Sequence, residues 1–352
     1  PATMLARLAW ARGRGGAAQA GVLAGAVLAG GSLSKKLVHT QAPVETAPPL
    51  CKSVSVYASR GPRSAMEDEF FVADDYSFFG VFDGHGGPSV SKYAKNHLFK
   101  HLKQELAGGA DPEAACATAF AKVSEAVLGN QRLDLEGSTA VAVLLEQDRL
   151  WTANLGDSRA VLCRDGEALD ITEDHKPNSP SEKERIEKLG GTVRWYGYLG
   201  PDRQPVHGMG AYRINGNLAV SRAFGDRLET PYVSDEPEIC CFERNPETDR
   251  FIILASDGLW DVMSSQEAVR FVQQILSGSV GALGQGGEAR GGIKTRRPSR
   301  SLTKWMRKYS GDTSMVRAVL DTRKAKIAKY LVEESLRRGT ADNVTVVVVW
   351  LR

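Results

Sequence analysis

Three runs of apolar residues that lie next to acidic side chains constrain the fold most. The runs and their acids are 78–82 with Asp83, 251–255 with Asp257, and 344–349 with Asp342. Glu67 and Asp68 precede a further short apolar run. Carboxylates at the ends of buried strands converge on one edge of a sheet, where they repel one another unless a cation lies among them. Because oxygen-only ligands suit Mg²⁺ or Mn²⁺, the pattern predicts a metal enzyme.

A single Asp-Gly pair predicts a turn before it predicts a metal ligand. Asp165-Gly166 lies between two apolar runs, and we interpret it as a hairpin turn. Asp83 and Asp257 differ because their context repeats. Each is followed by more polar and glycine residues than a two-residue turn needs.

Length and composition indicate an ordinary globular protein. The chain has 352 residues, of which 42% are hydrophobic and 25% charged, so one or two domains are expected. Its five cysteines form no Cys-x-x-Cys pair and have no histidine cluster nearby. A disulfide framework or structural zinc is therefore not expected, and a reducing compartment fits better.

The net charge of +3 hides a strong asymmetry. Residues 1–50 carry +4 and residues 277–326 carry +9, which leaves −10 on the remainder. An acidic body fits cation binding. It argues against a nucleic-acid partner, which needs a basic groove.

Residues 1–50 differ from the rest of the chain. Arg7, Arg12 and Arg14 precede an Ala/Gly/Val/Leu stretch, and no acid appears before Glu45. Arg-rich, acid-poor composition is typical of transit peptides, so we expect targeting to the mitochondrion or another organelle. A signal sequence or membrane anchor and a plain disordered tail in a cytoplasmic protein remain as alternatives.

Helical and strand patterns occur in separate blocks, which indicates the α+β class. Helices are predicted at 88–106, from the N-cap Asp111 to Gly129, from a capping box at Ser181 to Gly190, and from a capping box at Ser264. Short strands are predicted at 139–145, 149–155, 159–164 and 168–171. Their short connections predict an antiparallel meander.

Seven motifs in a fixed order resemble the metal-dependent, type 2C family of Ser/Thr protein phosphatases. They are 63–68 (RSAMED), 83–87 (DGHGG), 137–140 (GSTA), 156–159 (GDSR), 217–226 (NLAVSRAFGD), 255–261 (ASDGLWD) and 342–343 (DN). The resemblance covers about 53–276 and 327–352. It implies an antiparallel β-sandwich flanked by helices on both faces, in four αββα layers. The predicted phosphatase domain is 51–352, with a flap at about 173–216 and a basic, largely disordered insert at about 277–326.

The resemblance also implies the ligands of two Mg²⁺ or Mn²⁺ ions. Asp83 would bridge both ions, with the Gly84 carbonyl and Glu67 on one side and Asp257 and Asp342 on the other. Asp68 would orient bound waters or stand behind the ligands. Asp157 and Asp261 resemble ligands of a third, weaker ion, and each fits equally well as a turn or N-cap residue.

His85 and Arg63 are the catalytic candidates. A serine or threonine alkoxide is a poor leaving group, and a histidine near neutral pKa can protonate it. The alternative for His85 is packing within a glycine-rich loop. Arg63 presents a guanidinium fork suited to phosphoryl oxygens, and the alternative is an ordinary surface arginine. Arg222 and Asp226 are expected to brace the flap against the core rather than to take part in chemistry.

The predicted function is therefore hydrolysis of phosphoserine and phosphothreonine in proteins by attack of a metal-activated water. The alternatives are a catalytically inactive, phosphatase-like binding module and another two-metal hydrolase such as a nuclease. Phosphorylated proteins are the expected partners, and we expect a monomer.

The insert allows two interpretations. It is a solvated basic loop, or it is a docking loop for acidic partners or anionic surfaces. Two arginines upstream of Ser299 resemble a site for a basic-directed kinase, and phosphorylation there would offset part of the +9 charge.

Overall fold

The computed structural model describes residues 49–277 and 313–351, and these residues belong to one compact unit. The targeting, anchor and tail predictions for residues 1–50 fall almost entirely outside the described residues, as does most of the predicted insert. No described helix is both long and apolar enough to cross a membrane.

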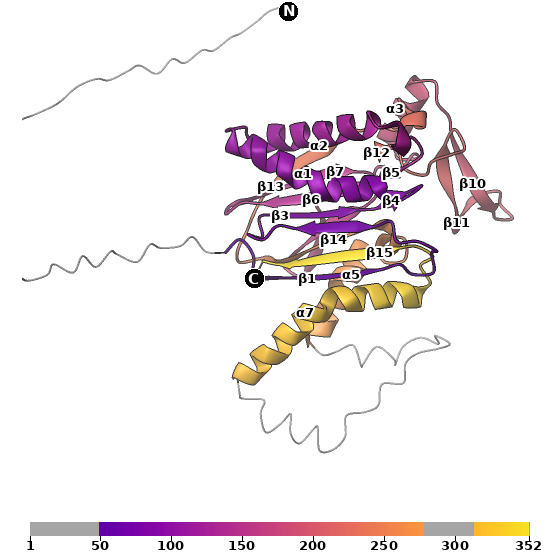
Figure 1. Ribbon diagram of the computed structural model, residues 1–352. Helices are drawn as coiled ribbons and strands as arrows, with labels where there is room; N and C mark the ends of the chain where they lie inside the picture. The colour runs from indigo at the N-terminus through magenta and orange to yellow at the C-terminus, as the bar shows by residue number, and fades with distance from the viewer. Residues whose placement is uncertain (1–48, 278–312, 352) are drawn as a thin grey trace, which may run out of the picture. The chain divides into compact units, whose positions relative to one another are not determined.

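Two five-stranded antiparallel sheets form the centre of the molecule (Figure 1). The first sheet has the order β1 (Ser53–Ser59), β15 (Val344–Trp350), β14 (Asp249–Ala255), β8 (Arg159–Arg164) and β9 (Glu167–Asp170). The second has the order β13 (Glu238–Glu243), β7 (Arg149–Leu155), β6 (Ala140–Leu145), β3 (Phe78–Phe82) and β2 (Glu69–Val72).

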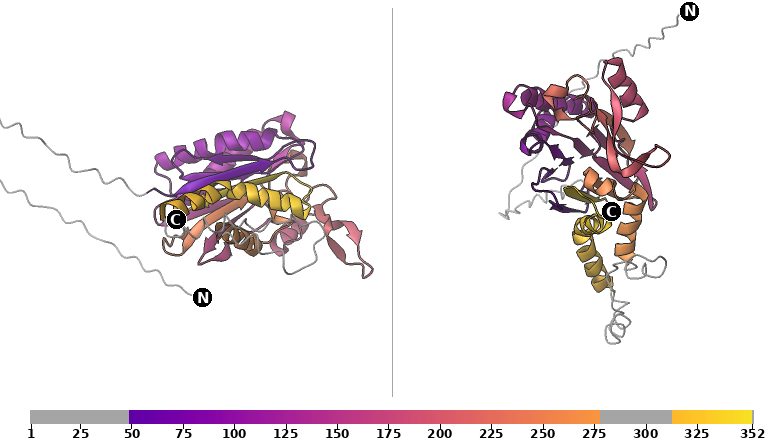
Figure 2. Two further views of the ribbon diagram at one scale, coloured as in Figure 1. Left: turned by 90° about the horizontal axis from the view of Figure 1, so that it is seen from below. Right: turned by 90° about the vertical axis from the view of Figure 1, so that its right-hand side faces the viewer.

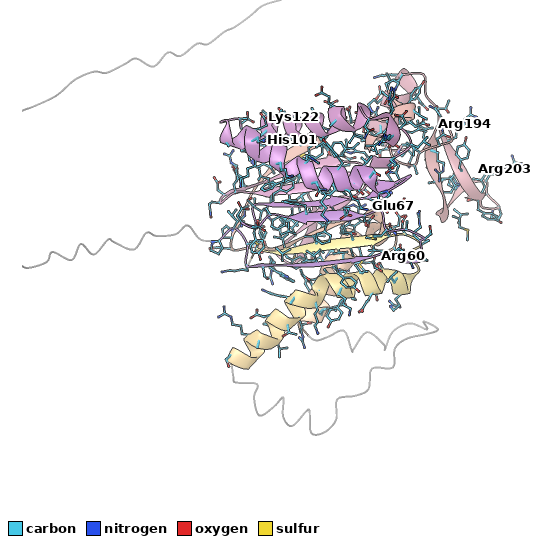
Figure 3. The ribbon with its side chains drawn as sticks, viewed as in Figure 1. Arg60, Glu67, His101, Lys122, Arg194 and Arg203 are labelled. Carbon is cyan, nitrogen blue, oxygen red and sulfur yellow. The ribbon has the colours of Figure 1, made fainter. Side chains whose placement is uncertain are left out.

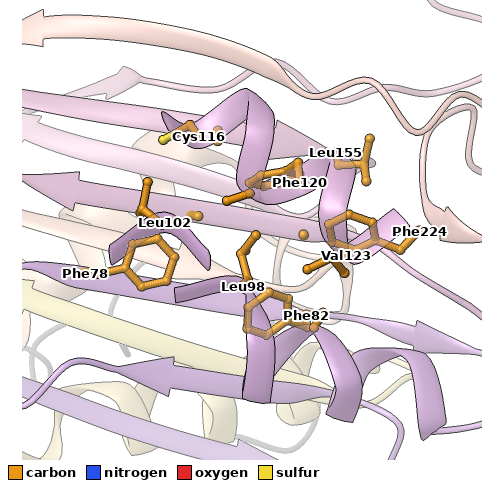
Figure 4. Packing of buried hydrophobic residues seen from close by; sticks show 14 of the residues in the cluster. Phe78, Phe82, Leu98, Leu102, Cys116, Phe120, Val123, Leu155 and Phe224 are labelled. Atoms are coloured by element: carbon orange, nitrogen blue, oxygen red, sulfur yellow. The ribbon is translucent and has the colours of Figure 1, made fainter. Parts of the chain in front are cut away.

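Helices cover the outer face of each sheet. Helices α1 (Ser89–Ala107) and α2 (Pro112–Leu128) pack on the second sheet, whereas α5 (Ser265–Ser277) and α7 (Thr313–Arg338) pack on the first (Figures 1 and 2). This arrangement confirms the predicted four-layer α+β sandwich. Figure 4 shows the outer layer, where Phe78 and Phe82 of β3 meet Leu98 of α1 and Phe120 of α2.

Strand alternation explains the unbroken apolar runs. In β3, Phe78 and Phe82 face the helices, while Phe79 and Val81 face the opposite sheet. Both faces are therefore buried, and the strand needs apolar side chains at every position. At roughly 25 cal/mol per Å², such burial is the main stabilising contribution to the fold.

The local helix signals are confirmed at three places. Asp111 caps α2 by accepting a hydrogen bond from the amide of Ala114, and Gly129 ends that helix. Ser264 and Glu267 form the predicted capping box of α5: the Glu267 carboxylate accepts from the Ser264 amide at 2.9 Å, and the Ser264 hydroxyl accepts from the Glu267 amide at 3.3 Å. The predicted helix at 88–106 is α1.

The prediction of a capping box at Ser181 was wrong. The N-cap of helix α3 (Pro180–Lys188) is Ser179, two residues before the predicted Ser181, and Pro180 lies in the first turn. A proline favours the first helical position because it has no amide hydrogen to leave unpaired.

The predicted meander was wrong at one connection. Strands β6 and β7 pair, and β8 and β9 pair around the Asp165-Gly166 turn, but β7 and β8 lie in different sheets. Gly156, with φ of +110°, lies in the connection that passes from one sheet to the other. The short link at 156–158 is therefore a crossing between the layers of the sandwich and not a hairpin.

The boundary of the insert also needs correction. Helix α7 begins at Thr313, so residues 313–326, predicted to belong to the insert, are helical. The helix packs against β1, where the Ser55 hydroxyl donates to the Ala325 carbonyl at 3.0 Å and accepts from the Ala328 amide at 3.2 Å. The basic residues of this stretch lie on the first turns of α7, ahead of Ile327, Ala328 and Leu331, which pack on the first sheet. A charge count alone does not reveal this helix.

Two smaller elements lie at one end of the sandwich. A three-stranded sheet has the order β12 (Phe224–Gly225), β5 (Gly137–Ser138) and β4 (Gly84–His85). The hairpin of β10 (Val193–Leu199) and β11 (Pro205–Ile214) projects beside it within the predicted flap (Figure 1).

Candidate active site

The acidic cluster, by which we mean Glu67, Asp68, Asp83, Asp257 and Asp342, lies at the end of the sandwich nearest the β10–β11 hairpin. Asp83 follows β3, Asp257 opens the short helix α4 (Asp257–Trp260) after β14, and Asp342 precedes β15. Glu67 and Asp68 come just before β2. Figure 3 shows Glu67 at this end of the strands. The topology therefore collects acids that are far apart in sequence.

Backbone contacts fix Asp83. Its amide donates to the Thr139 hydroxyl at 3.2 Å, and its carbonyl accepts from the Thr139 amide at 2.9 Å. The Thr139 hydroxyl also bonds to that of Ser158 at 2.7 Å. Thr139 leads into the second sheet and Ser158 into the first, so this contact ties both sheets together beside Asp83.

At Gly84 the backbone passes close to Glu67 and Ser91. A Cβ on Gly84 would overlap the Glu67 carbonyl and the Ser91 hydroxyl, which themselves bond at 2.6 Å. Only glycine lets the chain run this close to the Glu67 loop. The residue whose carbonyl is expected to act as a ligand thus lies beside the loop that carries Glu67.

Burial and the repulsion of neighbouring carboxylates raise the pKa values of three of these acids, Asp68, Asp83 and Asp257. Burial, followed by the charges of Asp68 and Asp257, raises the pKa of Asp83 well above its usual range. Burial and neighbouring aspartates, Asp157 first, do the same for the pKa of Asp257. Burial raises the pKa of Asp68 to about 6, against a hydrogen bond from Ser256. These acids are close enough to favour a cation among them.

The donor set fits hard divalent ions. Oδ1 of Asp68 and Oδ1 of Asp257 are buried and accept no hydrogen bond from a described residue. Such oxygens are available to a cation. Within the described residues, however, no three His, Cys, Asp or Glu side chains already stand in an arrangement that could ligate an ion. Oδ2 of Asp342 accepts from Arg63 at 2.6 Å and is therefore already engaged by a cationic side chain.

Arg63 lies at the surface beside the acidic cluster. Its Nε donates to the Ala341 carbonyl at 3.1 Å, and its Nη2 reaches Asp342. The side chain is 53% exposed, so part of the guanidinium fork faces solvent. Arg63 is thus next to Asp342, one of the expected ligands.

His85 has Asp226 as its hydrogen-bond partner, a residue predicted to have another role. Its Nε2 bonds to both carboxylate oxygens of Asp226, at 2.7 and 2.9 Å. Burial alone would lower the pKa of His85, but the hydrogen bond and charge of Asp226 outweigh it and raise the pKa. Asp226 was expected to brace the flap, and the structure places it against the candidate acid instead.

Asp157 and Asp261 are brought together by Lys176. The Lys176 ammonium lies 3.2 Å from Asp157 Oδ2 and 3.7 Å from Asp261 Oδ1. The charge of Asp157 is the main reason that the pKa of Lys176 is raised. The ammonium ion of Lys176, a residue without a predicted role, neutralises the same pair that the resemblance suggested for a third ion.

Arg222 lies at the base of the flap. Its Nη2 and Nε donate to Oε1 of Glu182 in α3, at 2.8 and 3.1 Å. Its Nη1 donates to the Glu236 carbonyl at 3.0 Å. Arg222 therefore connects the flap helix to the segment that leads into β13.

Comparisons with known proteins agree with this architecture. Residues 54–282 match the family model described as protein phosphatase 2C. Probable protein phosphatase 2C 71 of Arabidopsis thaliana is 38% identical over 300 residues, which cover 83% of this chain and 54% of that protein. Probable protein phosphatase 2C 59 of Arabidopsis thaliana is 38% identical over 301 residues, covering 83% and 77%.

Solved structures give the same result. A Caenorhabditis elegans sex-determining protein is similar with a TM-score of 0.64 and 26% identity, covering 85% of this chain and 65% of that one. A serine-threonine phosphatase 2C from Toxoplasma gondii is similar with a TM-score of 0.57 and 25% identity, covering 86% and 98%. The chain therefore belongs to the protein phosphatase 2C family of Ser/Thr protein phosphatases.

Proposed function

We propose that this chain hydrolyses phosphoserine and phosphothreonine in proteins at the end of the sandwich where the acidic cluster lies. The observation that supports this most is the convergence of buried aspartates with raised pKa values, because such a cluster is unfavourable unless it binds cations. The catalytically inactive alternative is disfavoured, since every expected ligand position carries an oxygen donor.

The acidic cluster and the Gly84 carbonyl would hold two divalent ions, Mg²⁺ or Mn²⁺. When bound, such ions supply an activated water and neutralise phosphoryl oxygens. Asp157 and Asp261 would hold a third only if Lys176 moved away from them.

The protein's own side chains would bind and protonate the substrate. Arg63 would bind phosphoryl oxygens with its exposed guanidinium group. His85 would donate a proton to the departing serine or threonine oxygen, since an alkoxide leaves poorly unless it is protonated.

The test is metal dependence in the full chain. Activity on a phosphoserine peptide should require Mn²⁺ or Mg²⁺ and disappear in EDTA. Asp83→Asn should lower kcat by about a thousandfold or more, because it removes a charge that a cation needs. Asp165→Asn is the matched control, since it changes an aspartate in the β8–β9 turn. Full activity of Asp83→Asn, or activity in chelator, would refute the proposal.

A further inference from the structure

The small sheet β4–β5–β12 brings His85 and Asp226 together. Its central strand β5 pairs with β4 on one side and with β12 on the other. In this register Gly137 lies opposite both His85 and Gly225, and Asp226 follows Gly225 directly. His85 therefore lies on one outer strand and Asp226 directly after the other, and their side chains meet across the middle strand.

Gly137 leaves room for the hydrogen bond between His85 and Asp226. A Cβ at this position would overlap Nε2 of His85 and Oδ2 of Asp226 at once. The absence of a side chain at position 137 of the central strand thus leaves the space in which the two groups bond. This gives the glycine a role connected with the site, because its own φ is not in the left-handed region.

The backbone holds the Asp226 carboxylate in place. Asp226 has φ of +48° and ψ of +41°, a left-handed conformation that aspartate and asparagine tolerate better than most residues. Its amide donates to the Glu136 carbonyl at 3.1 Å, and its carbonyl accepts from the Glu229 amide at 2.8 Å. The residue is only 5% exposed, so its carboxylate is directed by the fold and not by solvent.

We propose that Asp226 is a positioning residue that sets the orientation of the His85 ring. This inference rests on the proposed proton donation by His85. With Nε2–H held by Asp226, the other ring nitrogen, Nδ1, is the one left for the substrate. Among the described residues, Nδ1 has no protein hydrogen-bond partner. Asp226 would stabilise the ring in one orientation and tautomer, as an orienting carboxylate does for a histidine elsewhere.

The proposed proton transfer is balanced. A water oxygen forms the new bond to phosphorus and releases its proton to solvent. The bond between phosphorus and the seryl oxygen breaks, and its electron pair stays on that oxygen. The oxygen takes the proton from Nδ1 of His85, which leaves a neutral imidazole with Nε2–H still donated to Asp226. The ring regains its proton from solvent before the next turnover.

The experiment compares two leaving groups in the full chain. His85→Ala should lower kcat on a phosphoserine peptide by about a hundredfold, and Asp226→Asn by at least about tenfold, with KM changed less than about twofold. Both should stay within about threefold of the parent protein on p-nitrophenyl phosphate, whose phenolate leaves without protonation. Asparagine keeps the shape and the left-handed conformation of Asp226, so the fold should be retained.

A double variant separates positioning from general stability. Because Asp226 would act only through His85, Asp226→Asn should lower kcat by less than about twofold in the His85→Ala background. Gly137→Ala should reproduce the leaving-group selectivity of Asp226→Asn by a different route. Arg227→Ala is the matched control, since Arg227 is the next residue but pairs with Asp134 at 3.2 Å and not with His85.

The outcomes distinguish the two proposals. If His85→Ala slows both substrates equally, the proton-donor role of His85 fails, and the inference about Asp226 fails with it. If His85→Ala is selective but Asp226→Asn is not, only the role of Asp226 is overturned. Independent, multiplying losses in the double variant would also overturn it, as would selectivity in Arg227→Ala.

Discussion

Asn343 shows how one amide side chain organises the loop that carries Glu67. Its Oδ1 accepts from the Glu67 amide at 2.8 Å. Its Nδ2 donates to the carbonyls of Arg60 and Ala65, at 2.8 and 3.0 Å. The residue is 4% exposed, so water cannot easily replace these three bonds. Asp342 directly precedes Asn343 in the sequence. Asn343 therefore fixes the position of the Glu67 backbone relative to Asp342.

Replacing Asn343 should weaken metal use as well as stability. Asn343→Ala leaves three backbone groups without partners, and we expect the free energy of unfolding to fall by about 3 kcal/mol. The Mn²⁺ concentration for half-maximal activity should rise about tenfold, because groups that orient ligands affect affinity on that scale. Urea unfolding and a metal titration of activity measure the two effects.

A control amide makes that test specific. Asn130→Ala removes a side chain that accepts only from the Arg132 amide at a short helical turn. Its metal requirement should match that of the unchanged chain. If Asn343→Ala lowers stability but leaves the metal titration unchanged, Asn343 is a structural residue only.

At the scale of elements, helix α3 is attached to the core through the Glu182 carboxylate. Arg222 holds Oε1, and Arg185 donates to Oε2 at 2.8 Å. Arg185 also reaches the Ser221 carbonyl at 2.8 Å. The Glu182 side chain is 2% exposed. One buried carboxylate thus joins the flap helix to the segment around Arg222.

This attachment predicts a pH dependence of stability. Burial would raise the pKa of Glu182, but the bonds from Arg222 and Arg185 prevail and lower the pKa from 4.5 to about 2. The stabilisation is therefore fully present above pH 4.5 and is lost as pH falls through about 2. Between pH 7 and pH 3 the free energy of unfolding of the parent chain should therefore fall by about 2 kcal/mol more than that of Glu182→Gln.

Urea unfolding at the two pH values measures this difference. Glu187→Gln changes a half-exposed acid on the same helix, paired with Lys183 at 3.8 Å, and should keep the pH dependence of the unchanged chain. Equal acid sensitivity of Glu182→Gln and the parent would rule out this carboxylate as the source.

The elements themselves were largely predictable, because each leaves a local signal. Apolar runs located β3, β14 and β15, and the caps at Asp111 and Ser264 located the starts of α2 and α5. The crossing at Gly156 was not predictable, since a short link can join strands of one sheet or of two. The contact between His85 and Asp226 was not predictable either. It spans 141 positions and depends on strand pairing through Gly137, which neither local sequence reveals.

At the scale of the whole molecule, the excess of basic residues lies in two segments of the sequence, 1–50 and 277–326, and the remainder is acidic. The acidic body carries the site, and the +4 of residues 1–50 lies outside it. We propose that residues 1–50 direct the protein to the mitochondrion or another organelle. Fused to a fluorescent reporter, this segment should move the reporter out of the cytosol. A reporter that stays cytosolic would contradict the proposal.

The basic stretch between α5 and α7 can be tested as a docking loop. Residues 280–310 carry a net +7. Helices α5 and α7 also contact each other directly, without residues 280–310. Nη1 of Arg323 in α7 donates to the Leu276 carbonyl at the end of α5, at 2.6 Å. Replacing 280–310 with a Gly/Ser linker should therefore leave kcat on a small phosphopeptide within about twofold of the parent.

The same replacement should weaken binding to an acidic surface. We expect the full chain to bind vesicles of mixed neutral and anionic lipid, or an acidic peptide, at low salt. Salt screens charges that are farther apart than the Debye length, which is about 10 Å at 0.1 M. The binding should therefore be lost between 50 and 300 mM salt. The linker variant should bind weakly at all salt concentrations. Ser299→Glu should weaken binding in the same direction but less, since it offsets one charge only, and Ser299→Ala should not. Loss of peptide activity in the linker variant would make the stretch part of the catalytic fold, and salt-independent binding would exclude the electrostatic role.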